Sequence, residues 1–115
     1  MGVAIGLSTN DAEEPARANL AAHSILEYFD FIAGYDSGYG AKPGTGMQEA
    51  FLAQARLEAS DVAMVGDSLH DLISGRDAGM RTIAVLSGPA TEAELLPFAD
   101  IVLPDIGHIP DLMKR

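Results

Sequence analysis

The chain has 115 residues, 48% of them hydrophobic, which is enough to bury the core of one compact domain. Its 7 lysines and arginines against 17 aspartates and glutamates give a net charge of −10, so nucleic acid and anionic membrane surfaces are not expected partners. The absence of cysteine excludes disulfides, a thiolate nucleophile and cysteine-bound zinc and fits a cytoplasmic protein, and no apolar run is long enough to span a bilayer.

Short apolar runs alternate with stretches of helical periodicity. Because the apolar runs are continuous, they predict parallel strands that are covered on both faces. Strands are expected at residues 3–7, 31–33, 62–65, 82–86 and 101–103. The alternation predicts one α/β domain over residues 1–115, with a mostly parallel sheet, flanking helices and its chemistry at the carboxyl ends of the strands.

Four helices are expected between these strands. The first begins near Asn10 or Asp11, either of which could cap the free N–H groups of its first turn. Its apolar face is expected to hold Ala18, Ala22, Ile25 and Phe29. The second covers residues 46–57, with a stripe formed by Met47, Phe51 and Ala55.

The third helix covers residues 69–78 and ends at Gly79, which suits a left-handed cap. The fourth opens at Thr91, with Glu94 at the spacing of a capping box. The turns that follow the fourth and fifth strands, at residues 87–89 and 104–105, suggest no chemistry.

Polar side chains follow the first two strands. Ser8-Thr9-Asn10 leads from a strand into a helix, where a hydroxyl and free N–H groups can bind an anion, although a helix cap explains the same residues. Lys42-Pro43 ends the glycine-rich loop after the second strand. This lysine could hold a fixed positive charge over a site, or it could be one of the many solvated surface lysines.

The third strand is followed by the most informative segment, Gly66-Asp67-Ser68-Leu69-His70-Asp71. Asp67 stands at the end of a buried strand and Asp71 in the first turn of the next helix, so both carboxylates could face one Mg²⁺ ion. A capping box between Ser68 and Asp71 is the structural alternative, and it leaves Asp67 unexplained. Of the three histidines, only His70 is near this segment; His23 and His108 are expected to pack or lie at the surface.

Thr9-Asn10, Lys42-Pro43 and Gly66-Asp67-Ser68-Leu69-His70-Asp71, in this order, resemble the second, third and fourth motifs of the haloacid dehalogenase (HAD) superfamily, most closely its phosphoglycolate-phosphatase-like hydrolases. The segments 29–31 and 74–80 also resemble that subgroup. The resemblance implies a Rossmann-like fold and Mg²⁺-dependent hydrolysis of a small phosphorylated metabolite.

The resemblance also implies roles for single residues. Thr9 and the backbone N–H of Asn10 would bind the phosphoryl group, with Ser8 a less favoured substitute for Thr9. Lys42 would act with Thr9 in catalysis by balancing negative charge on the phosphate. Asp67 would bind Mg²⁺ directly, and Asp71 directly or through water.

The family's first motif, a strand followed by the nucleophilic aspartate and an acid–base aspartate, has no counterpart here, because no aspartate precedes Asp11. We therefore expect a C-terminal fragment without a cap domain and without the central strand, inactive by itself. Met1 directly before a strand suggests a truncated or mis-started reading frame. Loss of the central strand would leave two free strand edges unless the gap closes, and such edges promote self-association.

Two other functions are consistent with these residues. A non-catalytic module could bind Mg²⁺ and phosphate and be completed by a partner chain. A phospho-accepting receiver domain uses similar groups, but its acidic pair comes first and its lysine last, the reverse of the order here. The residues do not identify the substrate or the oligomeric state.

Overall fold

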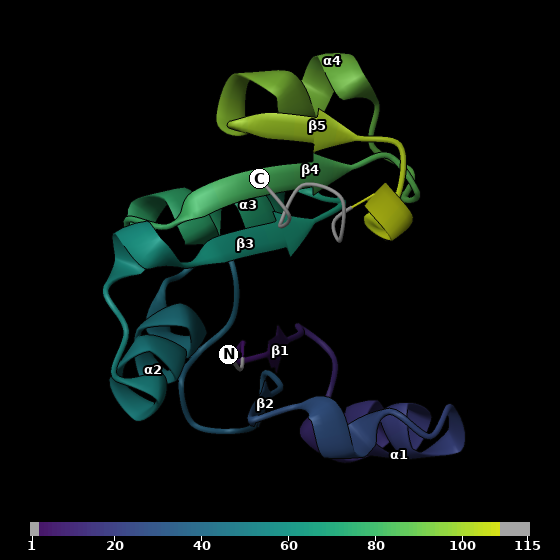
Figure 1. The fold of residues 1–115 in the computed structure, drawn as a ribbon, viewed down its shortest axis with the longest axis vertical. Coiled ribbons are helices and arrows are strands. Elements are labelled where there is room, and N and C mark those ends of the chain that lie inside the picture. Colours follow the sequence, from purple (N-terminus) through teal and green to yellow (C-terminus); the bar gives the residue numbers. More distant parts are fainter. Residues whose placement is uncertain (1–2, 109–115) are drawn as a thin grey trace. The chain divides into compact units, whose positions relative to one another are not determined.

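Parallel strands and helices alternate along the chain in the computed structural model, which describes residues 3–108 (Figure 1). The chain divides into two compact units, Met1–Leu57 and Glu58–Arg115. In the first unit, β1 (Gly6–Ser8) pairs in parallel with β2 (Phe31–Ala33). The second unit holds a parallel sheet in the order β3-β4-β5, formed by Ala63–Gly66, Arg81–Val85 and Ile101–Leu103. The predicted α/β class with parallel strands is confirmed.

The strands lie close to the predicted apolar runs. β2 and β5 match them, and β3 and β4 are displaced by one residue. β1 begins later than predicted, at Gly6, and the N–H of the preceding Ile5 donates to the carboxylate of Asp30 at 2.9 Å. The side chain of Val3, at the start of the predicted run, is 61% exposed.

One edge of β1 and one edge of β3 have no strand partner among residues 3–108. In that part of the chain β1 pairs only with β2, and β3 only with β4.

The first helix differs from the prediction. α1 spans Glu13–Ala22 and its N-cap, Ala12, makes no side-chain cap hydrogen bond. Instead the carboxylate of Asp36, from the loop after β2, accepts the N–H of Glu13 at 2.9 Å. Neither Asn10 nor Asp11 caps the helix, because a distant residue satisfies its first turn.

The predicted apolar face of α1 was also wrong. The helix ends before Ser24, whose φ of 59° lies in the left-handed region, and a short 3-10 turn, Leu26–Tyr28, follows. Ala18, Ala22 and Ile25 are exposed, and Phe29 lies beyond the helix. No residue of α1 is fully buried.

α2 (Gly46–Ala55) provides the core of the first unit. Its predicted stripe is confirmed: Met47 is buried, and Phe51 and Ala55 are partly buried. Met47 and Phe51 pack with Phe31 and Ala33 of β2. This packing holds α2 against the short parallel pair, because apolar area is removed from water on both elements.

α3 (Leu69–Asp77) begins and ends with recognisable caps. Ser68 is its N-cap. At the other end Gly79, with φ of 87°, donates to the carbonyl of Arg76 at 3.0 Å, and Met80 donates to Gly75 at 2.9 Å. These two bonds form a Schellman motif, so the predicted glycine cap is confirmed.

α4 (Glu92–Leu95) begins with the predicted capping box between Thr91 and Glu94. The core of the second unit consists of Leu72, Ala84 and Leu95, all fully buried, from α3, β4 and α4. Further 3-10 turns lie at Ala59–Asp61, Leu96–Phe98 and Ile106–His108. None of the helices described is long and apolar enough to cross a membrane.

Candidate functional site

In the first unit, Lys42 is held against the residues that end β1. The side-chain oxygen Oδ1 of Asn10 accepts the N–H of Lys42 at 2.8 Å, and Nδ2 of Asn10 donates to the carbonyl of Lys42 at 2.9 Å. The Lys42 ammonium donates to the main-chain oxygen of Ser8 at 2.8 Å. The structure thus brings together two predicted segments that are 32 residues apart.

The hydroxyls of Ser8 and Thr9 have different surroundings. Gln48, a buried residue of α2, donates to Oγ of Ser8 at 3.1 Å. The Thr9 hydroxyl accepts the N–H of Asp11 at 3.1 Å. Because a hydroxyl oxygen that accepts one bond still has its own proton to donate, Thr9 retains a donor suited to an anion.

The start of α1 is tied to the loop that carries Lys42. The Ser37 hydroxyl donates to Oε1 of Glu13 at 2.6 Å and accepts the N–H of Gly34 at 2.8 Å. Arg17 donates to the other carboxylate oxygen of Glu13 at 2.7 Å. The bond from Ser37, and after it the bond from Arg17, lower the pKa of Glu13 below its ordinary value of 4.5, because both donors favour the charged carboxylate.

Gly34 is needed where this loop leaves β2. A Cβ at this position would meet backbone atoms at the start of α1, including the carbonyl oxygen of Asp11 at 2.5 Å and the carbonyl carbon of Ala12 at 2.8 Å. Backbone atoms cannot swing aside as the end of a flexible side chain can. The loop therefore approaches α1 closely because residue 34 has no side chain.

In the second unit, Asp67 and Asp71 lie at the carboxyl end of β3. Asp67 directly follows Gly66, the last residue of β3, and is partly buried. Ser68 Oγ donates to Oδ2 of Asp71 at 3.1 Å and accepts the Asp71 N–H at 3.4 Å. Ser68 thus caps α3, which is one half of the capping box considered for Ser68 and Asp71, and the cap makes no use of Asp67.

Two glycines make room for these carboxylates. A Cβ at Gly66 would stand 2.6 Å from Oδ2 of Asp71, and a Cβ at Gly88 would stand 2.5 Å from Oδ2 of Asp67. Gly88, in the turn after β4, was not predicted to contribute, because a glycine next to a proline is typical of any turn. Only the tertiary fold shows that it borders Asp67.

The two carboxylates that follow β3 do not form a full protein cage for a metal ion with other described residues. Among residues 3–108 there is no group of three or more histidine, aspartate or glutamate side chains arranged to hold a metal ion. His70 is exposed on the first turn of α3, and the His23 ring contacts the Asn19 carbonyl at 2.9 Å on α1. The side chain of His108 lies outside the described part of the structure.

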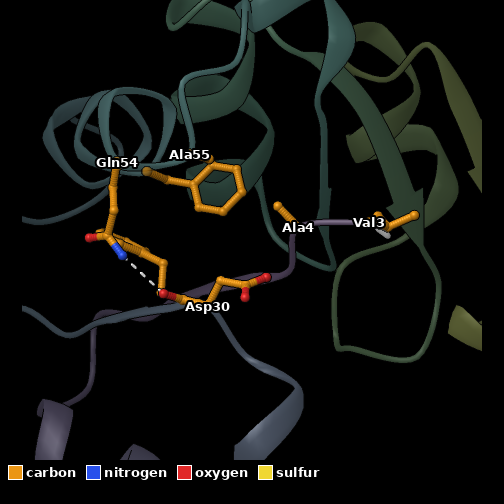
Figure 2. Close-up of a pocket in the computed structure, with 7 residues that line it drawn as sticks. Val3, Ala4, Asp30, Gln54 and Ala55 are labelled. Carbon is orange, nitrogen blue, oxygen red and sulfur yellow. Dashed lines mark hydrogen bonds between the residues drawn. The ribbon is translucent and has the colours of Figure 1, made fainter. Parts of the chain in front are cut away.

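The first unit contains a cavity of about 420 Å³ (Figure 2). Its lining residues precede β1 and β2 or lie late in α2: Val3, Ala4, Asp30, Phe31, Phe51, Gln54 and Ala55. Gln54 Nε2 donates to the main-chain oxygen of Asp30 at 3.0 Å, the bond drawn in Figure 2. Ligands of open α/β sheets bind beyond the carboxyl ends of the strands, so this cavity is at the wrong end of β1 and β2 for that chemistry.

Comparison with known sequences identifies relatives over most of the chain. The model of the haloacid dehalogenase-like hydrolase family matches residues 1–85. A protein named Probable phosphatase IndB, from Dickeya dadantii, is 36% identical over 96 residues, covering 82% of this chain and 41% of IndB. Pyrophosphatase PpaX from Bacillus mycoides is 29% identical over 117 residues, covering 99% of this chain and 54% of PpaX. The chain thus spans about half the length of these curated relatives.

Solved structures with the same fold cover nearly the whole chain. A HAD phosphatase from Thermococcus onnurineus superposes with a TM-score of 0.85 at 21% identity, over 97% of this chain and 51% of that protein. A "predicted phosphoglycolate phosphatase" from Haemophilus somnus gives a TM-score of 0.89 at 21% identity, over 97% of this chain and 50% of that protein. These structures share the fold, and the match of the family model to residues 1–85 shows that the chain belongs to the haloacid dehalogenase-like hydrolase family.

Proposed function

We propose that this chain supplies the phosphate-binding and metal-binding groups of a Mg²⁺-dependent phosphomonoester hydrolase that acts in the cytoplasm on a small phosphorylated metabolite. The observation that supports this most strongly is the link between the end of β1 and Lys42, made by two bonds from Asn10 and one to Ser8. A lysine held at a strand end beside a hydroxyl donor suits a bound anion, because its charge needs little rearrangement to act.

In this proposal, Thr9 and the main-chain N–H of Asn10 donate hydrogen bonds to phosphoryl oxygens. Lys42 balances the negative charge that the transferred group carries. Catalysis of phosphoryl transfer consists largely of such positioning and charge stabilisation. Asn10 binds the main chain of Lys42, and the bond from the ammonium to the Ser8 carbonyl holds the positive charge at the end of β1.

Asp67 and Asp71 fit the requirements of Mg²⁺. This ion commonly uses one or two protein carboxylates and completes its octahedral shell with water and phosphate oxygens, so a pair is sufficient. When bound, Mg²⁺ would neutralise charge on the phosphoryl group. Because Gly66 and Gly88 have no side chains, the carboxylates of Asp71 and Asp67 can lie close to the main chain at these two positions.

The covalent step of HAD-type hydrolysis uses an aspartate nucleophile, and the chain has no aspartate before Asp11. We therefore propose that the 115-residue chain binds Mg²⁺ and phosphate but does not hydrolyse phosphomonoesters by itself. A non-catalytic module that binds Mg²⁺ and phosphate and is completed by a partner chain is the second candidate, since the same residues would hold both ions.

Two measurements on the purified chain test these proposals. Calorimetry should detect binding of inorganic phosphate that strengthens with Mg²⁺, and Asp67→Asn should remove this Mg²⁺ effect. Asp61→Asn is the matched control, because Asp61 is an exposed acid of the same unit. No binding of either ion contradicts both candidate functions. Turnover of p-nitrophenyl phosphate that Asp67→Asn abolishes contradicts the proposed inactivity.

A further inference from the structure

The Asn10 side chain links the end of β1 to the loop that carries Lys42. Its single planar carboxamide binds both main-chain polar groups of Lys42, as acceptor at 2.8 Å and as donor at 2.9 Å. The two partners are 32 residues apart, so the bonds join a strand end to a loop rather than completing a local turn. An asparagine amide can both donate and accept, and aspartate, serine or alanine cannot reproduce this pair of bonds in the same geometry.

The Lys42 side chain is then fixed at both ends. Its main chain is held by Asn10, and its ammonium donates to the Ser8 carbonyl at 2.8 Å. A long lysine side chain loses substantial rotamer freedom when it is held in one geometry. Fixing the main chain at its base reduces the number of directions that the ammonium can take.

We propose that the Asn10 side chain is a positioning residue for the Lys42 ammonium, a role separate from that of the Asn10 main-chain N–H. The inference rests on the proposed phosphate-binding function of Lys42 and deepens it. Supporting hydrogen bonds of this kind hold a binding group in its productive geometry, and their loss lowers affinity without removing any group that touches the ligand.

The test uses the 15N-labelled 115-residue chain with Asn10→Ala, Asn10→Asp, Lys42→Met and Asn19→Ala. Asn10→Asp keeps an acceptor for the Lys42 N–H and places a second acceptor, instead of a donor, against the Lys42 carbonyl. Asn19→Ala makes the same chemical change as Asn10→Ala at an exposed position on α1. Lys42→Met identifies the Lys42 ammonium signal by its disappearance.

The first readout is the side-chain 15N–H signal of the Lys42 ammonium without phosphate, which reports its hydrogen bond to Ser8. We expect Asn10→Ala and Asn10→Asp to weaken or shift this signal, and Asn19→Ala to leave it unchanged, while the amide spectra show that all variants are folded. An unchanged ammonium signal in both Asn10 variants overturns the proposal. If Asn10→Ala does not fold, the Lys42 ammonium signal of Asn10→Asp alone tests the proposal.

The second readout is the affinity for inorganic phosphate, measured by calorimetry with the same proteins. We expect Lys42→Met to weaken binding about tenfold or more, and Asn10→Ala to weaken it about threefold to tenfold, as for loss of hydrogen bonds between neutral groups. Full affinity in Asn10→Ala also overturns the proposal. Wild-type protein that binds no phosphate, but in which Asn10 still governs the Lys42 ammonium signal, contradicts the proposed function and leaves the positioning role supported.

Discussion

The carboxylate of Asp71 lies against the α-carbon of Gly66, so that a Cβ at position 66 would stand 2.6 Å from Oδ2 and 2.7 Å from Cγ. This contact makes Gly66 a structural requirement for the orientation of Asp71 at the start of α3. The same carboxylate receives a hydrogen bond from Ser68 at 3.1 Å. The Asp71 carboxylate is therefore held by its contact with Gly66 and by the hydrogen bond from Ser68.

Gly66→Ala should destabilise the chain by about 1–3 kcal/mol, the usual range for an overpacked site. Because the new methyl group would clash with the Asp71 side chain, Asp71→Gly should relieve the destabilisation. The double variant should be more stable than the sum of the two single effects predicts, by about 1 kcal/mol or more. Urea unfolding of the four proteins measures this coupling. Additive effects would show that the new methyl group does not act through Asp71.

Ser68→Ala and Asp67→Asn should separate helix capping from metal binding. Ser68→Ala removes the N-cap of α3 and should cost about 1 kcal/mol of stability, with a smaller loss of Mg²⁺ affinity than Asp67→Asn causes. Asp67→Asn should lower Mg²⁺ affinity about tenfold or more through the loss of a charged ligand, with little change in the stability of α3. Urea unfolding and Mg²⁺ calorimetry on both variants provide the two readouts. The opposite pattern would make Asp67 a structural residue.

Local sequence signals predicted the fold well where one segment determines the outcome. The apolar runs at β2 and β5, the Thr91–Glu94 capping box and the Gly79 cap depend on neighbouring residues alone. The start of α1 failed because Asp36, from beyond β2, supplies the cap. Its apolar face failed because the left-handed Ser24 ends the helix within the predicted repeat.

The candidate site likewise contains residues that the sequence could identify and contacts that it could not. Thr9, Lys42, Asp67 and Asp71 could be selected from sequence because each follows a predicted strand, where parallel sheets gather their chemistry. The Asn10 side chain and Gly88 could not be assigned their contacts. Their partners, Lys42 and Asp67, are far away in sequence, and an asparagine in a turn or a glycine beside a proline has many local explanations.

The pKa of Glu13 provides a test of the link between α1 and the loop after β2. Donors from Ser37 and then Arg17 lower this pKa, so the link stabilises the fold above the ordinary pKa of glutamate and is lost as the pH falls through the lowered value. NMR titration should give a midpoint below 4.5 for Glu13. Ser37→Ala and Arg17→Gln should each raise it.

The stability of the Ser37→Ala variant should show the same dependence on pH. Its loss of stability relative to wild type should be larger at pH 7 than at a pH below the Glu13 midpoint, where the carboxyl is protonated in both proteins. Part of the loss should persist at low pH, since Ser37 also accepts the N–H of Gly34. A loss that does not vary with pH would show that the hydroxyl acts only through Gly34.

The free edge of β3 should promote self-association of the 115-residue chain. Arg81 N–H donates to the Val62 carbonyl, so by the alternation of a parallel ladder the main-chain groups of Ala63 and Val65 point to the other edge, where the described residues provide no strand. Unpaired edges are templates for further strands, and a lysine on the edge opposes pairing. We therefore expect the average mass to rise with concentration and Ala63→Lys to reduce this rise.

Sedimentation velocity across the micromolar to millimolar range measures this association. Ala53→Lys is the matched control, because it makes the same exchange at an exposed position of α2 and lowers the net negative charge equally. An effect of Ala63→Lys alone assigns the association to the β3 edge. An equal effect of both variants would assign it to overall charge. A chain that stays monomeric throughout contradicts the prediction, since the unpaired edge of β3 would then be insufficient to bring copies together.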